Sequence, residues 1–102
     1  MLKILLLGEK SKTGTSVKNV FTRDYELIGL NSNDFDANDF KYVESIIKNI
    51  KPDILINCVA KNGIKPCEND PTDAFTLNTL FPKHLAQLSN DLNFIFIHFS
   101  SD

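Results

Sequence analysis

The chain has 102 residues and a mass of 11.5 kDa, which is the size of one small domain and excludes a second. Its 11 basic and 13 acidic residues leave a formal net charge of −2, and the basic side chains are scattered, so a nucleic-acid partner is not expected. The N-terminal apolar run Ile4 to Leu7 is far shorter than the roughly 20 residues of a membrane span or the roughly 7 of a signal-peptide core. These features favour a cytoplasmic protein with no membrane partner.

The two cysteines, Cys58 and Cys67, have no second pair and no nearby histidine. They therefore indicate neither a zinc site nor a disulfide framework. We expect two reduced thiols and no bound metal, with Cys58 a small buried apolar side chain and not a nucleophile.

Four apolar runs are predicted to be β-strands, at residues 2–7, 25–30, 53–58 and 94–99. The first, third and fourth are nearly continuous in apolar residues. This pattern is typical of strands that are covered on both faces, and so of a parallel sheet.

Helical spacing of apolar residues fills the intervals between these strands. One helix is predicted from Gly14 to about Thr22, and a second over residues 39–50, with Asn38 or Asp39 placed to cap its start. A third is expected from the dipeptide at 70–71, an aspartate followed by proline, which is a frequent helix start.

The third helix contains Pro82, whose backbone nitrogen has no hydrogen to donate. The carbonyl of Asn78, four residues earlier, therefore loses its helical partner, and a kink is predicted between Asn78 and Pro82. Asn78 could then support the strand that follows this helix. A side chain that faces solvent is an equally good interpretation.

Alternating strands and crossover helices predict an α/β fold, a doubly wound parallel sheet with right-handed connections and the strand order 3-2-1-4. The chain ends at residues 100–102, directly after the fourth predicted strand. A complete domain of this kind normally adds at least one more helix and strand. We therefore expect residues 1–102 to be the first part of a longer protein.

A glycine-containing loop follows the first strand and leads into the first helix, over Gly8-x-x-Ser11-x-x-Gly14. In this position a loop lets a pyrophosphate approach backbone N–H groups at the start of a helix. Ser11 stands where a middle glycine would be expected. A strand-to-helix turn that merely favours glycine is an equally good reading of these residues alone.

Further segments strengthen the cofactor interpretation: Asn33-Asp34-Phe35-Asp36, Lys51-Pro52-Asp53 through Asn57-Cys58-Val59-Ala60, Glu68-x-Asp70-Pro71, Leu77-Asn78, Pro82-Lys83-His84-Leu85-Ala86 and His98-Phe99-Ser100-Ser101-Asp102. Together with the glycine loop they resemble the dTDP-4-dehydrorhamnose reductase family of extended short-chain dehydrogenases/reductases. That family typically shows G-x-x-G-x-x-G, K-P-D-x-x-[IV]-N-x-A-A and S-T-D-Y-V-F. The resemblance covers essentially the whole chain and implies the N-terminal part of an NAD(P)-binding Rossmann domain, without the C-terminal substrate-binding part.

The resemblance implies which residues meet the cofactor. The loop residues Gly8, Ser11 and Gly14 match the phosphate-binding loop. Asp34 and Phe35 match an adenine-binding pair, although a solvated Asp34 that only forms a turn is the alternative. The further matches lie along the cofactor or beside the active-site strand: Cys58, Val59, Ala60 and Asn78.

Asn31 follows the second strand, where an aspartate would bind the ribose 2′-hydroxyl or an arginine the 2′-phosphate. An uncharged residue does not repel a 2′-phosphate, and Lys10 and Lys12 could reach it. NADPH is therefore slightly favoured, with NADH also accepted, although two solvated loop lysines are the simpler interpretation.

Ser101 is the candidate catalytic residue, because it matches the threonine that donates a hydrogen bond to the substrate carbonyl in this family. The family's Tyr-x-x-x-Lys pair is absent here, because Tyr25 is followed four residues later by Gly29 and Tyr42 by Ile46. In that pair the lysine lowers the tyrosine pKa so that the phenol can act as an acid. We expect the pair beyond residue 102 and this segment alone to be inactive.

The resemblance thus implies NAD(P)H-dependent reduction of a dTDP-linked 4-keto sugar, in deoxysugar or cell-surface polysaccharide biosynthesis, and is compatible with a homodimer of the intact protein. Two alternatives stay open. One is a sugar-nucleotide epimerase or dehydratase built on the same half-domain. The other is a non-catalytic dinucleotide-binding regulatory subunit, which the departure from glycine at Ser11 favours.

Overall fold

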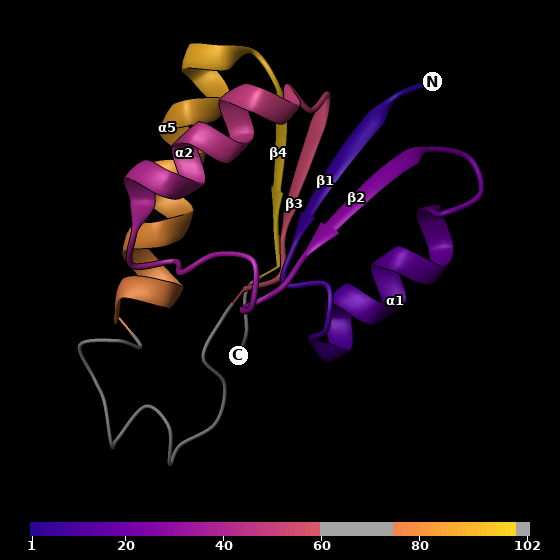
Figure 1. The fold of residues 1–102 in the computed structure, drawn as a ribbon, viewed down its shortest axis with the longest axis horizontal. Helices are drawn as coiled ribbons and strands as arrows, with labels where there is room; N and C mark the ends of the chain where they lie inside the picture. Colours follow the sequence, from indigo (N-terminus) through magenta and orange to yellow (C-terminus); the bar gives the residue numbers. More distant parts are fainter. Residues whose placement is uncertain (60–74, 100–102) are drawn as a thin grey trace.

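Short runs rich in isoleucine and leucine form the strands of one parallel sheet with helices on both faces (Figure 1). The computed structural model describes residues 1–59 and 75–99. In chain order the elements are β1 (Lys3–Leu7), α1 (Lys12–Phe21), β2 (Glu26–Leu30), α2 (Phe40–Ile50), β3 (Ile54–Asn57), the π-helical turn η1 (Thr76–Leu80), α5 (Phe81–Leu92) and β4 (Ile95–His98). The predicted α/β fold and its doubly wound parallel sheet are confirmed.

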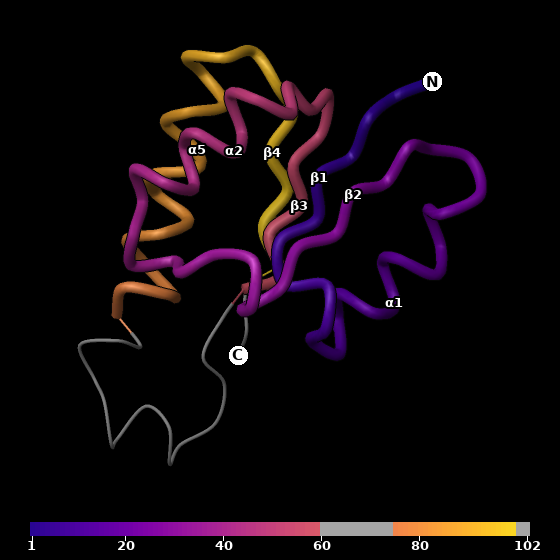
Figure 2. Tube along the Cα trace, viewed as in Figure 1, coloured from indigo at the N-terminus to yellow at the C-terminus, as the bar shows by residue number. Residues whose placement is uncertain are grey.

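The strand order is β2-β1-β3-β4, so the predicted order 3-2-1-4 is wrong. β1 lies in the middle, with Leu7 opposite Leu30 of β2 and opposite Asn57 of β3. Figure 2 shows the reason: α1 lies on one face of the sheet, whereas α2 and α5 lie on the other. A right-handed crossover on the opposite face runs in the opposite direction along the sheet, so α2 carries the chain back across β1. The predicted order would need α1 and α2 on the same face.

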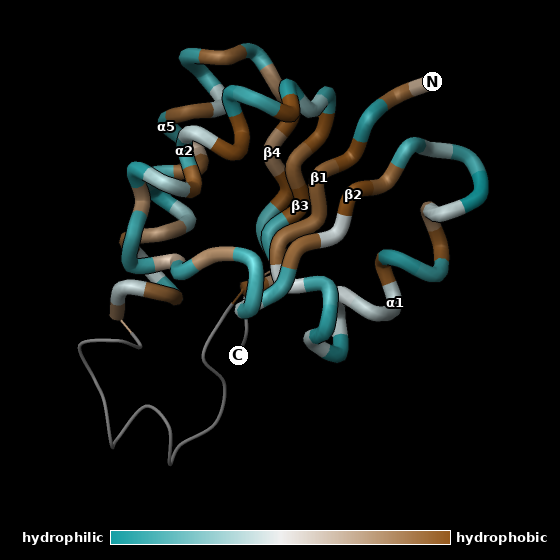
Figure 3. The backbone as a smooth tube through the Cα atoms, in the orientation of Figure 1, coloured by the Kyte–Doolittle hydropathy of each residue, from teal (hydrophilic) through white to brown (hydrophobic). Residues whose placement is uncertain are grey.

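Alternating side chains of β1 divide the core into two layers. Leu5 and Leu7 pack towards α2 and α5, whereas Ile4 and Leu6 pack towards α1, and all four are fully buried. Figure 3 shows the central strands as the most hydrophobic stretch of the backbone. This double burial explains why the strand is a continuous apolar run.

The fourth strand departs from the prediction that both of its faces are covered. Its α5 face packs Phe96 against the core, but Ile95 and Ile97 on the other face are 61% and 41% exposed within the described part of the chain. On that face, Val17 of α1 belongs to a buried cluster with residues of β1 and β3 such as Leu6 and Ile56. Among the described residues, this cluster includes none from β4.

The helix ends follow from local side chains. Asp39 caps α2 through its Oδ1, which accepts from the Tyr42 N–H at 3.3 Å, as one of the two predicted caps. The predicted kink site takes the form of the π-helical turn η1, in which the N–H of Phe81 donates to the carbonyl of Thr76. A π turn accommodates the missing donor of Pro82. Among the described residues, no helix is both long and apolar enough to cross a membrane.

Candidate functional site

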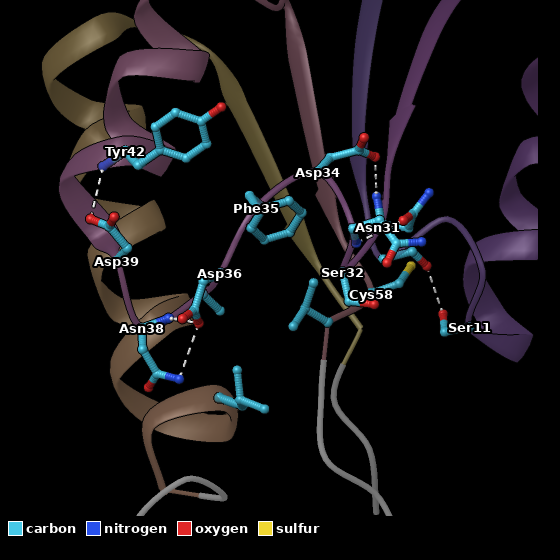
Figure 4. Close-up of a pocket in the computed structure, with 15 residues that line it drawn as sticks. Ser11, Asn31, Ser32, Asp34, Phe35, Asp36, Asn38, Asp39, Tyr42 and Cys58 are labelled. Carbon is cyan, nitrogen blue, oxygen red and sulfur yellow. Dashed lines mark hydrogen bonds between the residues drawn. The ribbon is translucent and has the colours of Figure 1, made fainter.

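The carboxyl ends of the four parallel strands lie at one edge of the sheet (Figure 1). There β1 is followed by α1 on one face and β3 by α5 on the other, which makes the gap between them a topological switch point. Ligands of open α/β sheets bind at such points. A pocket with a volume of about 870 Å³ opens here (Figure 4), lined by Gly8, Ser11, residues 31–39, Tyr42, Cys58, Val59 and Leu77.

The floor of this pocket depends on two glycines. Gly8 has a φ of +84°, and a Cβ added to it would lie 2.8 Å from the carbonyl carbon of Cys58. A Cβ on the buried Gly14 would lie 2.0 Å from the carbonyl oxygen of Gly8. The first position therefore requires a glycine for its backbone conformation, and the second lets α1 pack directly on the loop.

Ser11, the residue in place of a middle glycine, closes the loop with its own side chain. Its Oγ donates to the carbonyl of Gly8 and accepts from the N–H of Gly14, both at 2.9 Å. Ser11 is thus the N-cap of α1, and it also lines the pocket. The N–H groups of Lys12 and Thr13 precede the first intrahelical hydrogen bond, so they can donate to an anion.

The segment between β2 and α2 is a series of turns, each closed by a hydrogen bond from a backbone N–H to a side-chain carboxylate (Figure 4). Asp34 Oδ2 accepts from the N–H of Asn31 at 2.8 Å, and Asp36 Oδ1 accepts from the N–H of Asn38 at 2.9 Å. Asp34 therefore does form the turn that was the alternative to adenine binding. A carboxylate has room for further donors, so the turn does not remove its capacity to accept from a ligand amine.

Phe35 connects the pocket to the hydrophobic core. Only 8% of it is exposed, and its ring stacks on Phe81 of α5 with centroids 6.3 Å apart. Its position gives the pocket a flat apolar wall beside the polar turns of residues 31–39.

The ends of β3 and β4 are joined by a polar pair of one buried and one half-buried side chain. Asn57 is fully buried, its Oδ1 accepts from the N–H of Val59 at 3.1 Å, and its Nδ2 lies 3.1 Å from His98 Nδ1. The amide nitrogen of Asn57 can only donate, so His98 accepts at Nδ1 and carries its proton on Nε2. Burial lowers the pKa of His98, which keeps the ring neutral. The Asn57 side chain thus holds Val59 and the end of β4 at the rim of the pocket.

Two further side chains at this edge, Cys58 and Glu9, have pKa values shifted from their ordinary ones. Burial raises the pKa of the Cys58 thiol, in keeping with a buried apolar role. The hydrogen bond from Asn31 and the ion pair with Lys18 lower the pKa of Glu9, which is therefore ionised at neutral pH.

Comparisons with known proteins agree on one family. The sequence model described as RmlD substrate binding domain matches residues 2–102. The chain belongs to this family. This result confirms the resemblance drawn from the motifs.

The dTDP-4-dehydrorhamnose reductase of Shigella flexneri is 28% identical over 105 residues, which cover 99% of this chain and 35% of that protein. A crystal structure of a dTDP-4-dehydrorhamnose reductase from Clostridium acetobutylicum superposes with a TM-score of 0.85 at 25% identity, covering 93% of this chain and 34% of that one. A reductase of the same name from Bacillus anthracis, solved in complex with NADP, has a TM-score of 0.83 at 17% identity, with 93% and 34% covered. This member of the RmlD family therefore spans about a third of the length of the relatives it matches.

The structure brings most of the predicted site residues of this RmlD family member into one pocket: Gly8, Ser11, Asn31, Asp34, Phe35, Cys58 and Val59. Gly14 lies beneath the loop, and Asn78 lies in η1, where its neighbour Leu77 lines the pocket. Ala60 and Ser101 fall outside the described residues.

Sequence reasoning missed the contact between Glu9 and Asn31 and the pairing of Asn57 with His98. Asn57 and His98 were visible in the sequence only as members of two separate motifs. Gly29 was the one local signal for the first contact, because a glycine inside a strand often marks the close approach of another group.

Proposed function

We propose that this chain is the cofactor-binding part of an NAD(P)H-dependent reductase that acts on a dTDP-linked 4-keto sugar. The pocket at the switch point carries the proposal, because its floor is a glycine turn that leads into the amino end of α1. The names of the Shigella flexneri and Clostridium acetobutylicum relatives support the substrate, and the NADP of the Bacillus anthracis structure supports the cofactor.

The residues of the pocket fit a dinucleotide. Gly8 and Ser11 line the pocket beside the first turn of α1, where free backbone N–H groups can donate to a phosphate. Phe35 offers an apolar wall for a base, and Asp34 a carboxylate that can accept from its amine. Cys58 and Val59 at the end of β3 are small enough for the dinucleotide to pass over the backbone.

When bound, the cofactor supplies the hydride for reduction of the ketone. The chain's own contribution is orientation. The Ser11-closed loop holds the phosphate position, and Asn57 fixes Val59 at the rim of the pocket. Ser101 is proposed to donate a hydrogen bond to the substrate carbonyl oxygen, an interaction that strengthens as negative charge develops there.

Binding of the cofactor can be measured directly by isothermal titration of the chain with NADH and with NADPH. We expect binding of at least one, and weaker binding after Asp34→Ala. Asp24→Ala is the matched control, because Asp24 is an exposed aspartate before β2, at the opposite edge of the sheet. Absence of binding by either cofactor would refute the proposal, and equal effects of the two substitutions would remove Asp34 from the site.

The test of activity uses the full reading frame. We expect it to reduce a dTDP-4-keto sugar and Ser101→Ala to lower kcat with little change in cofactor affinity. The isolated segment should be inactive, because neither Tyr25 nor Tyr42 has a lysine four residues later to make it a general acid, a group worth roughly 10² to 10⁴ in rate. Turnover by the segment, or an unchanged kcat in Ser101→Ala, would show that the chemistry is misassigned. Epimerisation or dehydration products would instead identify the related alternative.

The same proposal places the enzyme in the cytoplasm as a homodimer, in the biosynthesis of deoxysugars for cell-surface polysaccharides. Light scattering on the intact protein measures the assembly. The regulatory-subunit alternative drew on the missing glycine at Ser11, but Ser11 leaves the pocket open and caps α1. That observation no longer favours a non-catalytic role.

A further inference from the structure

Asn31, at the carboxyl end of β2, lies between two carboxylates. Its side-chain Nδ2 donates to Glu9 Oε2 at 2.8 Å, and its backbone N–H donates to Asp34 Oδ2 at 2.8 Å (Figure 4 shows the second bond). Its Oδ1 accepts from the N–H of Asn33 at 2.9 Å. The orientation of the Asn31 amide is therefore fixed, and two negative charges lie within one hydrogen bond of this residue.

Glu9 is built into this position and is not a mobile surface side chain. Its side chain is 14% exposed, and its Oε1 lies 3.1 Å from Lys18 Nζ. A Cβ on Gly29 of β2 would lie 2.3 Å from the same Oε1. The strand thus lacks a side chain at the one place where the carboxylate of Glu9 rests.

The carboxyl end of β2 is where a doubly wound sheet meets the adenosine ribose, and Asn31 lines the pocket. The inference therefore rests on the proposed cofactor function. A 2′-phosphate carries a charge of about −1.5 to −2 at neutral pH. Bound beside Asn31, it would face the carboxylates of Glu9 and Asp34. Among the described residues, Lys18 forms the ion pair with Glu9, and Lys10 adds a weaker attraction to its carboxylate. Lys10 and Lys12 are exposed on the loop.

We propose that Glu9 is a specificity-determining residue that makes NADH the preferred cofactor over NADPH. It orients Asn31 so that the second amide hydrogen can donate to a ribose oxygen, which both cofactors have. It also fixes a negative charge beside the 2′-position of the adenosine ribose. NADPH carries a phosphate at that position, and NADH does not. This reverses the slight preference for NADPH that the uncharged Asn31 suggested from sequence.

Glu9→Gln tests the charge while retaining an acceptor for Asn31. Repulsion between one unit charge and a 2′-phosphate at this solvent-accessible position amounts to about tenfold in affinity. We therefore expect Glu9→Gln to bind NADPH about tenfold more tightly than the unchanged chain, with NADH affinity within about twofold. Lys18→Met should have the opposite effect and weaken NADPH selectively, because it removes the cation that balances Glu9.

Glu26→Gln is the matched control. Glu26 is also a glutamate near a lysine, Lys3, at 3.9 Å, but it lies at the opposite end of β2 from Asn31. At roughly 3.3 Å per strand residue it is more than a Debye length away, so the ratio of the two affinities should not change. Titrations at about 0.5 M salt should shrink the Glu9 effect, which a purely steric preference would not show.

The outcomes separate this inference from the function on which it rests. If the unchanged chain binds neither cofactor, the proposed function fails and the inference fails with it. If it binds NADPH as tightly as NADH or more tightly, the function stands and the inference is wrong, and Lys10 and Lys12 become the residues to substitute. An unchanged ratio in Glu9→Gln also overturns it. Should Glu9→Gln not fold, as judged by circular dichroism, a Lys18→Met ratio that does not move refutes the inference alone.

Discussion

Ser11 provides the sharpest test of how the loop after β1 is built. Its Oγ satisfies two backbone groups at once, the carbonyl of Gly8 and the N–H of Gly14. Removing the hydroxyl in Ser11→Ala leaves both without this partner at a half-buried position. Loss of a serine N-cap costs about 1 kcal/mol, within a range of roughly 0.5 to 2. We therefore expect the free energy of unfolding to fall by about 1.2 kcal/mol.

Urea unfolding followed by circular dichroism measures this change. With a slope of about 1.5 kcal/mol per molar urea for a chain of this size, the midpoint should fall by about 0.8 M. Ser11→Gly should lose only a few tenths of a kcal/mol, because glycine is tolerated at N-caps where alanine is not. The expected order of stability is therefore serine, glycine, alanine.

Ser16→Ala is the control for the loss of a serine hydroxyl in the same helix. Its Oγ bonds the carbonyl of Lys12 on the exposed surface of α1. Alanine is the better helix former, so its midpoint should stay the same or rise slightly. An unchanged midpoint in Ser11→Ala, or a Ser11→Gly variant no more stable than Ser11→Ala, would refute the capping role.

Three further predictions concern the sheet and its carboxyl edge. Gly8→Ala should destabilise the chain by about 2 to 4 kcal/mol in urea unfolding, because it combines left-handed strain with a clash against the Cys58 backbone. Leu5→Ala should cost about 3 to 4 kcal/mol, since this fully buried side chain would leave a cavity between β1 and α5; a loss below about 1 kcal/mol would contradict the packing. Stability should fall as the pH drops through about 6.5, where the unfolded imidazole of His98 takes up its proton while the lowered pKa in the fold delays it. The difference between the parent chain and His98→Gln isolates this effect, and parallel pH profiles would show that His98 titrates normally.

The elements of this fold could be predicted from sequence because each is specified locally. The buried strands are apolar runs, and the cap of α2 is an aspartate directly before the apolar stripe. The order of the strands could not be predicted in this way. The apolar stripe of α2 indicates that the helix has a buried face. It does not indicate against which face of the sheet the helix packs. That choice depends on packing against α5, more than 30 residues further along the chain.

The candidate site was likewise predictable from sequence only where its features are local. The glycine loop and Asp34 could be found because both stand at strand ends in the expected spacing. The Glu9–Asn31 contact joins residues 22 positions apart, and it exists because β1 and β2 pair with Leu7 opposite Leu30. No local pattern contains that register.

Ser11 and Glu9 contribute to the same property of the loop after β1. Ser11 closes the loop onto Gly8 and Gly14, and Glu9 ties the loop to the end of β2 through Asn31 and to α1 through Lys18. A loop held at three points by its own side chains has less conformational freedom to lose when it binds a ligand. Under the proposed function, the Ser11 and Glu9 contacts would therefore hold the loop in its binding conformation before a cofactor arrives.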